Sequence, residues 1–109
     1  MSTAVSVSRS PAVVAAERLR CELARLGVAA DVHEGDGLAL LLVGVHLVVW
    51  CERGPVGWRY RWWTGGVSAR SGRWLYTGCR AAAVKTAALR VTARYAELRG
   101  DPSPCPLSW

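Results

Sequence analysis

The sequence predicts an α+β protein with two layers: an antiparallel four-stranded sheet that carries an N-terminal and a C-terminal helix on one face, in the order α-β-β-β-β-α. Two segments, one near each end, repeat apolar residues at the spacings of three and four that mark a helix. Between them lie β-rich segments separated by short glycine-containing turns, which join antiparallel strands. We expect a single domain over residues 10–100, a flexible N-terminus over 1–9 and a flexible proline-rich tail over 101–109.

The first helix is expected over residues 11–26. Ser10 offers its hydroxyl as an N-cap, and Pro11 suits the first helical position, where its missing N–H costs nothing. Gly27 can adopt the left-handed conformation that ends many helices. The apolar positions share one helical face and are Ala12, Ala16, Leu19, Leu23 and Leu26.

Four strands are expected between the helices. The most distinctive is the run from Leu38 to Cys51, which is rich in valine and leucine and contains few residues that break a strand. Gly44 marks a bend or bulge in it, because an interior glycine weakens the hydrogen-bonded ladder. The other strands are expected over residues 28–33, 58–64 and 73–77, and the turns or loops over 34–37, 53–57 and 65–72.

The second helix is predicted over residues 80–99. Thr77 or Cys79 is expected to cap its start, and Gly100 ends it. Because each helix has only one apolar stripe, both are expected to lie on the same face of the sheet. The stripe of this helix is Val84, Ala88, Val91, Tyr95 and Leu98.

Alternation along the strands assigns the two sheet faces. The odd positions of residues 39–51 are all apolar and are expected to face the helices. The even positions are also largely apolar, which is unusual for a face in contact with water. In the third strand Arg59 and Arg61 share a face, and burying two arginines without partners is costly, so their face is expected to be open.

The open face is therefore the candidate binding surface, and we expect a small non-enzymatic binding or regulatory protein. Exposed apolar surface usually marks an interaction site, and Trp and Arg are enriched at interface hot spots. The expected partner is a second copy of the chain, giving a homodimer, or another protein. The surface comprises Leu40, Leu42, His46, Val48, Trp50, Arg59, Arg61 and Trp63.

Nucleic-acid binding is the alternative, and uneven charge supports it. The net charge is +6, yet residues 1–52 carry four arginines and six acids, whereas residues 53–109 carry ten bases and two acids. Bases of a single strand can stack on aromatic rings while arginines contact the phosphates. Two arginines one turn apart on the second helix could add phosphate contacts. The residues expected in this alternative are Arg70, Arg73, Trp74, Arg80, Arg90 and Arg94.

An enzyme of unknown type is the third interpretation. The titratable candidates are few, and no motif combines them into a catalytic or ligand set. They are His33, His46, Cys79 and the acids Glu34, Asp36 and Glu52. We expect no catalytic residue, cofactor or metal site. The four cysteines lie 30, 28 and 26 residues apart without a C-x-x-C pair, which favours buried or incidental thiols in a reducing compartment.

Localisation follows from what the chain lacks. Its longest uncharged apolar run, from Leu38 to Cys51, has 14 residues, whereas a spanning helix needs roughly 20. The first ten residues lack the basic start and apolar core of a secretory signal. The sequence predicts a cytoplasmic protein that does not enter membranes.

Three segments carry a resemblance to known sequences. They are Arg-Leu-Arg-Cys-Glu-Leu-Ala-Arg-Leu-Gly (18–27), Trp-Arg-Tyr-Arg-Trp-Trp-Thr-Gly (58–65) and Ala-Ala-Leu-Arg-Val-Thr-Ala-Arg-Tyr-Ala-Glu-Leu-Arg (87–99). In these segments the chain is similar to small uncharacterised proteins of high-GC actinobacteria. The use of 13 arginines against one lysine fits the same source. The resemblance implies a bacterial cytoplasmic setting and transfers no activity and no functional residue.

Overall fold

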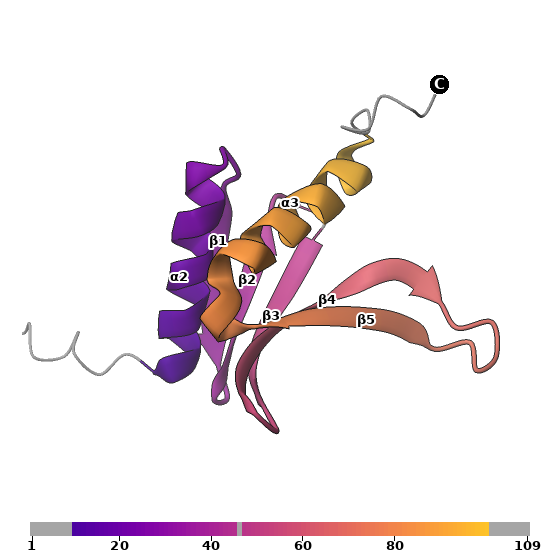
Figure 1. The fold of residues 1–109 in the computed structure, drawn as a ribbon, viewed down its shortest axis with the longest axis horizontal. Helices are drawn as coiled ribbons and strands as arrows, with labels where there is room; N and C mark the ends of the chain where they lie inside the picture. The colour runs from indigo at the N-terminus through magenta and orange to yellow at the C-terminus, as the bar shows by residue number, and fades with distance from the viewer. Residues whose placement is uncertain (1–9, 46, 101–109) are drawn as a thin grey trace, which may run out of the picture.

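The computed structural model describes residues 10–45 and 47–100. It has an α+β fold, in which one antiparallel sheet of order β1-β2-β3-β4-β5 packs against two helices (Figure 1). The strands are β1 (Ala30–Gly35), β2 (Leu38–Val43), β3 (Leu47–Gly54), β4 (Gly57–Val67) and β5 (Trp74–Arg80). The helices are α2 (Pro11–Arg25) and α3 (Val84–Arg99), with a short 3-10 helix η1 (Ala81–Ala83) before α3.

The described sheet has five strands, so the prediction of four was wrong. The predicted strand 38–51 is two strands, because the chain reverses direction at Gly44 instead of bending there. Gly44 has a φ of 63°, a left-handed conformation that glycine adopts without steric cost. It also lies against a side chain, since a Cβ at this position would be 2.5 Å from Cε1 of Tyr95.

The predicted alternation of buried and open positions holds on both sides of this reversal. Val43 pairs with Leu47, so the odd positions before and after the turn lie on the same face. Val45 is the exception, because it sits in the turn and is 88% exposed. The buried odd positions are Ala39, Leu41, Val43, Leu47, Val49 and Cys51.

Helix α2 forms as its capping residues predict. The Ser10 hydroxyl accepts a hydrogen bond from the Val13 backbone N–H at 3.2 Å, and Pro11 occupies the first turn. Gly27, with a φ of 81°, follows the end of the helix. Four stripe positions are buried, but Leu26 is 44% exposed because the helix has already ended there.

Helix α3 begins later than predicted, because β5 continues to Arg80. Thr77 and Cys79 lie within β5 and do not cap the helix, so that prediction was wrong; neither η1 nor α3 has a side-chain cap. The side chains of Thr77 and Cys79 instead form hydrogen bonds with residues of η1 and α3. The Thr77 hydroxyl accepts from Arg90, and the Cys79 thiol donates to the Ala83 carbonyl at 3.7 Å.

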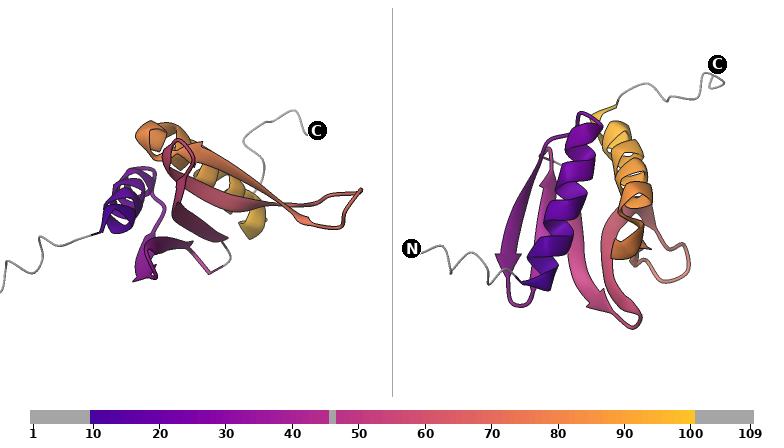
Figure 2. Two further views of the ribbon diagram at one scale, coloured as in Figure 1. Left: turned by 90° about the horizontal axis from the view of Figure 1, so that it is seen from below. Right: turned by 60° about the vertical axis from the view of Figure 1, so that its left-hand side comes forward.

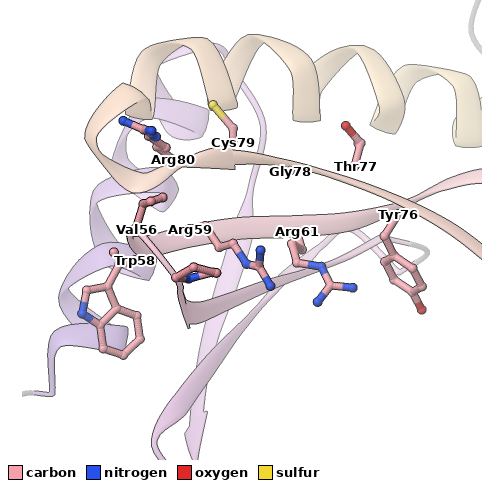
Figure 3. A pocket seen from close by; sticks show the side chains of 11 residues that line it. Val56, Trp58, Arg59, Arg61, Tyr76, Thr77, Gly78, Cys79 and Arg80 are labelled. Carbon is pink, nitrogen blue, oxygen red and sulfur yellow. The ribbon is translucent and has the colours of Figure 1, made fainter.

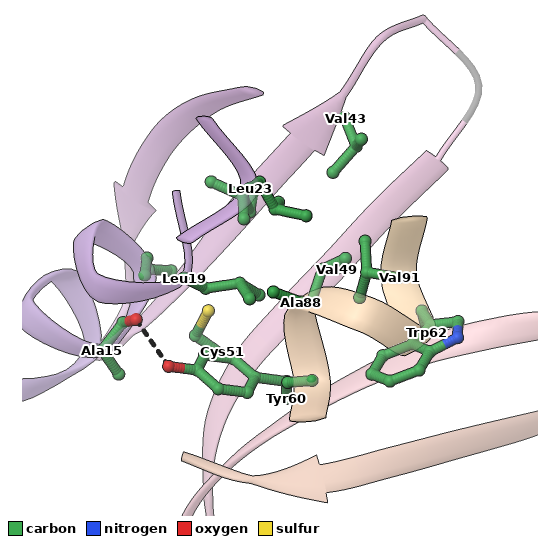
Figure 4. Packing of buried hydrophobic residues seen from close by; sticks show 14 of the residues in the cluster. Ala15, Leu19, Leu23, Val43, Val49, Cys51, Tyr60, Trp62, Ala88 and Val91 are labelled. Atoms are coloured by element: carbon green, nitrogen blue, oxygen red, sulfur yellow. Dashed lines mark hydrogen bonds between the residues drawn. The ribbon is translucent and has the colours of Figure 1, made fainter. Parts of the chain in front are cut away.

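A single buried cluster joins both helices to the sheet. Figure 2 shows α2 and α3 side by side on one side of the sheet, and Figure 4 shows side chains of both helices meeting those of β3 and β4. The hydroxyl of Tyr60 in β4 donates to the Ala15 carbonyl of α2 at 2.8 Å, so the buried phenol has its partner. No helix in the described ranges is long and apolar enough to cross a membrane.

Candidate functional site

The sheet has a second face, which points away from the buried cluster. Because side chains alternate along a strand, the even positions of β2 and β3 lie on this side. Leu40, Leu42 and Val48 are half-buried there, and Trp50 is 37% exposed. We call this the open sheet face, since no described element packs over these apolar side chains.

One row of residues crosses the open sheet face from edge to edge. Strand pairing aligns one residue from each strand, and the row reads His33, Leu40, Trp50, Arg61 and Gly78. Trp50 stands at its centre, on the middle strand. The sequence prediction that Trp50 and Arg61 share a surface therefore has a geometric basis in the β3–β4 register.

Glu52 holds two of the predicted surface arginines in place. Its Oε2 accepts from Nη2 of Arg59 at 2.7 Å and from Nη1 of Arg61 at 2.8 Å. Burial acts to raise the pKa of Glu52, but the hydrogen bonds and charges of Arg61 and Arg59 outweigh it and hold that pKa below its usual value. The carboxylate stays ionised, and the two guanidinium groups are ordered on the open sheet face.

Gly78 lets Arg61 lie across the neighbouring strand. The two residues are paired in register, and a Cβ at Gly78 would lie 2.7 Å from the Tyr60 carbonyl oxygen and 3.2 Å from Cγ of Arg61. Without that Cβ, the Arg61 guanidinium reaches a point 5.2 Å from the ring centroid of Tyr76, within cation–π range.

These side chains border a shallow hollow of about 390 Å³ along β4 and β5. Figure 3 shows Arg59, Arg61 and Tyr76 pointing to the same side, away from α3. Thr77 and Cys79 point toward α3, as alternation along β5 requires. The hollow therefore belongs to the open sheet face, and cations and an aromatic ring line it.

Beyond the Trp50–Arg61 pair, β3 and β4 separate. The first residues of β3 pair only with β2, while β4 continues with β5 as a ribbon that leaves the sheet (Figure 1). A cavity of about 270 Å³ lies between the diverging strands, and we call it the aromatic notch. Its lining residues are Leu47, Val48, Trp50, Trp63, Trp74, Tyr76, Arg94 and Leu98.

An irregularity in the ribbon builds one wall of the aromatic notch. Trp63 pairs with Tyr76, but the next pair is Val67 with Trp74, so three residues of β4 lie opposite one of β5. The Trp63 and Trp74 rings stack with centroids 4.2 Å apart and planes inclined by 24°. Trp74 is 58% exposed, which leaves part of the stack accessible.

Arg90 and Arg94 of α3 reach toward the sheet. Nε of Arg94 donates to the Trp63 carbonyl at 3.2 Å, and its Nη1 donates to Glu97 at 2.9 Å. Nη1 of Arg90 donates to the Gly78 carbonyl at 2.8 Å, and its guanidinium lies 5.1 Å from the Trp62 ring centroid. Both groups therefore already have intramolecular partners at positions predicted to contact phosphate.

Charge changes sign across the open sheet face. Asp31 is exposed on β1, and Glu34 and Asp36 stand at the β1–β2 turn. Residues 53–80, which make up the end of β3 and the β4–β5 ribbon, contain six arginines and no acid. The apolar centre thus lies between an acidic edge at β1 and an arginine-rich β4–β5 side, where Glu52 pairs with two of the six arginines.

The structure gathers some of the predicted residues and separates others. Five converge on the aromatic notch: Val48, Trp50, Trp63, Trp74 and Arg94. Leu40 and Leu42 lie beside Trp50 and Val48 through the β2–β3 register. Arg80 pairs with Arg59, whereas Arg70 and Arg73 lie exposed in the segment between β4 and β5. His46 lies outside the described residues.

Sequence reasoning missed Tyr76, and it considered Glu52 only as a titratable candidate, not as a residue of the open sheet face. Each lies two positions from a tryptophan that was named, Tyr76 from Trp74 and Glu52 from Trp50, so alternation alone places it on the same face. The pairing of Glu52 with Arg59 and Arg61 could not be read so directly, because it depends on the register between two strands.

Metal ligands do not cluster in the described ranges, which hold no group of three or more His, Cys, Asp or Glu side chains suited to a metal ion. The shape of the site is that of a surface, since a sheet face, a shallow hollow and a notch adjoin each other. Comparison with known proteins adds no further assignment: no family model, no curated protein and no solved structure matches the chain.

Proposed function

We propose that this protein is a binding module that acts through the open sheet face, and that the face pairs with a second copy of the chain. The observation that carries the proposal is the apolar centre formed by Leu40, Leu42, Val48 and Trp50, which no described element covers and which charges of opposite sign flank. Apolar surface of this kind usually marks an interaction site.

The distribution of charge favours a second copy as the partner. In a two-fold contact the same patch serves both subunits. If the axis lies in the interface along β3, then β1 of one copy faces β5 of the other. The acidic β1 edge of each copy then meets the arginine-rich β4–β5 side of the other, while Trp50 meets its own counterpart at the centre. Opposite charges at matching edges fix the orientation of such a pair.

Trp50→Ser tests this proposal by light scattering coupled to size exclusion. We expect the parent protein to have twice the mass of one chain and the variant to have the mass of one. A central tryptophan typically contributes at least about 2 kcal/mol to an interface, roughly a 30-fold change in Kd. Leu89→Ser is the matched control, because Leu89 is 62% exposed on α3 and should leave the dimer intact.

Circular dichroism of the Trp50→Ser variant separates loss of the interface from loss of the fold. A folded monomer supports the assignment of Trp50 to the interface. A parent protein that is monomeric at tens of micromolar, or a variant that remains dimeric, contradicts the proposal.

Binding of single-stranded nucleic acid is the second candidate, and a different observation favours it. The acid-free segment 53–80 carries six arginines beside the stacked Trp63 and Trp74 rings, a combination of cations and stacking surfaces that suits single strands. In this candidate a mixed-length oligonucleotide pool increases the mass of the protein at low salt, and high salt releases it. A mass that never responds to the pool excludes this candidate.

A further inference from the structure

The aromatic notch has the lining of a peptide-binding groove. Trp50, Trp63, Trp74 and Tyr76 bring flat rings to one cavity of about 270 Å³, and Trp74 and Tyr76 remain 58% and 44% exposed. The Trp63 indole N–H is already bonded to the Gly66 carbonyl, and Arg94 to the Trp63 carbonyl. The accessible surface is thus mainly apolar ring, which favours an occupant with flat or compact apolar side chains.

Proline-rich segments are the peptides that such grooves take. Proline favours the polyproline II conformation, so a segment with several prolines loses little entropy when it docks. Its rings pack against aromatic side chains, which is how proline-rich ligands bind aromatic-lined grooves in general. An extended strand is a weaker candidate, because it needs a free edge with several unpaired backbone groups, and the notch exposes only the first residues of β3.

A proline-rich segment of this chain follows helix α3, whose last turns border the notch. Residues 102–107 read Pro-Ser-Pro-Cys-Pro-Leu, with proline at alternate positions. Leu98 of α3 lines the notch, and the described chain ends at Gly100. Pro102 follows Gly100 by two residues, and an extended chain covers roughly 7 Å over two residues. The one charged side chain in 101–109 is the acid Asp101, which suits the arginine-rich ribbon.

We propose that residues 102–107 dock in the aromatic notch of the same molecule. The tether gives the segment an effective concentration on the order of millimolar, so even a weak site is occupied within one chain. The docked segment covers Trp74 and Tyr76, and the notch accepts a proline-rich peptide from another source only when the segment leaves. The notch shares Val48 and Trp50 with the apolar centre of the open sheet face. The docking is therefore tested at Trp74, which lies on the ribbon and outside that centre.

Fluorescence anisotropy with a labelled synthetic peptide of residues 101–107 tests the docking. The acceptor is the full chain with Pro102, Pro104 and Pro106 all replaced by serine, which frees the notch. We expect this acceptor to bind the peptide at least tenfold more tightly than the parent chain, whose own segment competes. Adding Trp74→Ala to the acceptor should abolish binding, whereas adding Leu89→Ala should leave it unchanged. Thermal melting confirms that both remain folded.

Four results overturn the proposal, three from the binding assay and one from light scattering. In the binding assay, these are failure of the acceptor to bind the peptide, equal binding by the parent chain, and continued binding by the Trp74→Ala acceptor. Light scattering supplies the remaining comparison: if the parent chain has a larger mass than the three-proline variant, the segment docks in a second copy and not in its own chain. A dimer through the open sheet face gives both proteins the same mass, so the two proposals fail independently.

Discussion

Glu52 is a single carboxylate that binds two arginines and holds them on one face of the sheet. Its Oε2 lies within 2.7 to 3.0 Å of three guanidinium nitrogens of Arg59 and Arg61, and its side chain is 23% exposed. Hydrogen bonds to charged groups each contribute more than neutral ones. Without this partner, two half-exposed arginines on adjacent positions of one face would repel each other. Glu52 therefore stabilises the basic half of the open sheet face.

Glu52→Gln should lower the free energy of unfolding by about 1–3 kcal/mol at pH 7, the range for a lost charged hydrogen-bond partner. The folded-state pKa of Glu52 is lowered, so its contribution is present above the unfolded pKa of about 4.3 and is lost as pH falls through the folded value. Urea unfolding between pH 7 and pH 3 should show a smaller acid-side loss in the variant than in the parent protein.

Glu97→Gln is the control for that measurement. Glu97 also binds an arginine, Arg94 at 2.9 Å, but its side chain is 64% exposed. Exposed pairs contribute up to about 1 kcal/mol. Equal losses of unfolding free energy in the two variants would mean that Glu52 stabilises the protein no more than an exposed ion pair does.

At the scale of elements, the β2–β3 hairpin shows which features the hydrophobic periodicity predicts and which it does not. The apolar run from residue 38 to 51 predicts extended chain and the correct buried positions. They are correct because Val43 pairs with Leu47, so odd-numbered residues lie on the same face before and after the turn. It does not predict the reversal, since Gly44 lacks the Asn-Gly or Asp-Gly signature of a tight hairpin. The turn uses a left-handed glycine, and the ring of Tyr95, 51 residues further along the chain, lies where a Cβ at this position would be.

Gly44→Ala and Gly27→Ala form a matched pair at this scale. Both positions have positive φ, so both variants lose about 1–2 kcal/mol from backbone strain. A new Cβ at Gly27 meets nothing within 4 Å, whereas at Gly44 it lies 2.5 Å from Tyr95. We therefore expect Gly44→Ala to destabilise the protein more than Gly27→Ala in denaturant unfolding, and Tyr95→Ala to remove the difference. Equal losses would show that Tyr95 does not restrict the turn.

The whole molecule depends on one buried cluster, and Cys51 lies inside it. Both helices and the strands contribute to that cluster, with Cys51 fully buried between α2 and Tyr60 (Figure 4). Burial raises the pKa of its thiol to about 12, so the reactive thiolate is scarce as well as inaccessible. Modification of Cys51 therefore requires the layers to separate.

Alkylation with iodoacetamide, followed by peptide mass mapping, measures this separation. We expect Cys21, which is exposed on α2, to react at the rate of a free thiol in native buffer. Cys51 should react at least 100-fold more slowly and reach the rate of Cys21 only in denaturant, because its opening is global. Similar native rates for the two cysteines would contradict the placement of Cys51 in the core.

The sequence by itself determined the features that follow from local periodicity. The stripes of the two helices, the Ser10 cap and the alternation of buried and open strand positions depend on residues at most four apart. Only the tertiary structure decided the fifth strand, the Glu52 pairing and the aromatic notch. Each of these depends on contacts across strands or between α3 and the ribbon, as when Leu98 and Trp74 line one cavity. Periodicity assigns a face to a side chain, but register and strand separation decide which side chains meet on it.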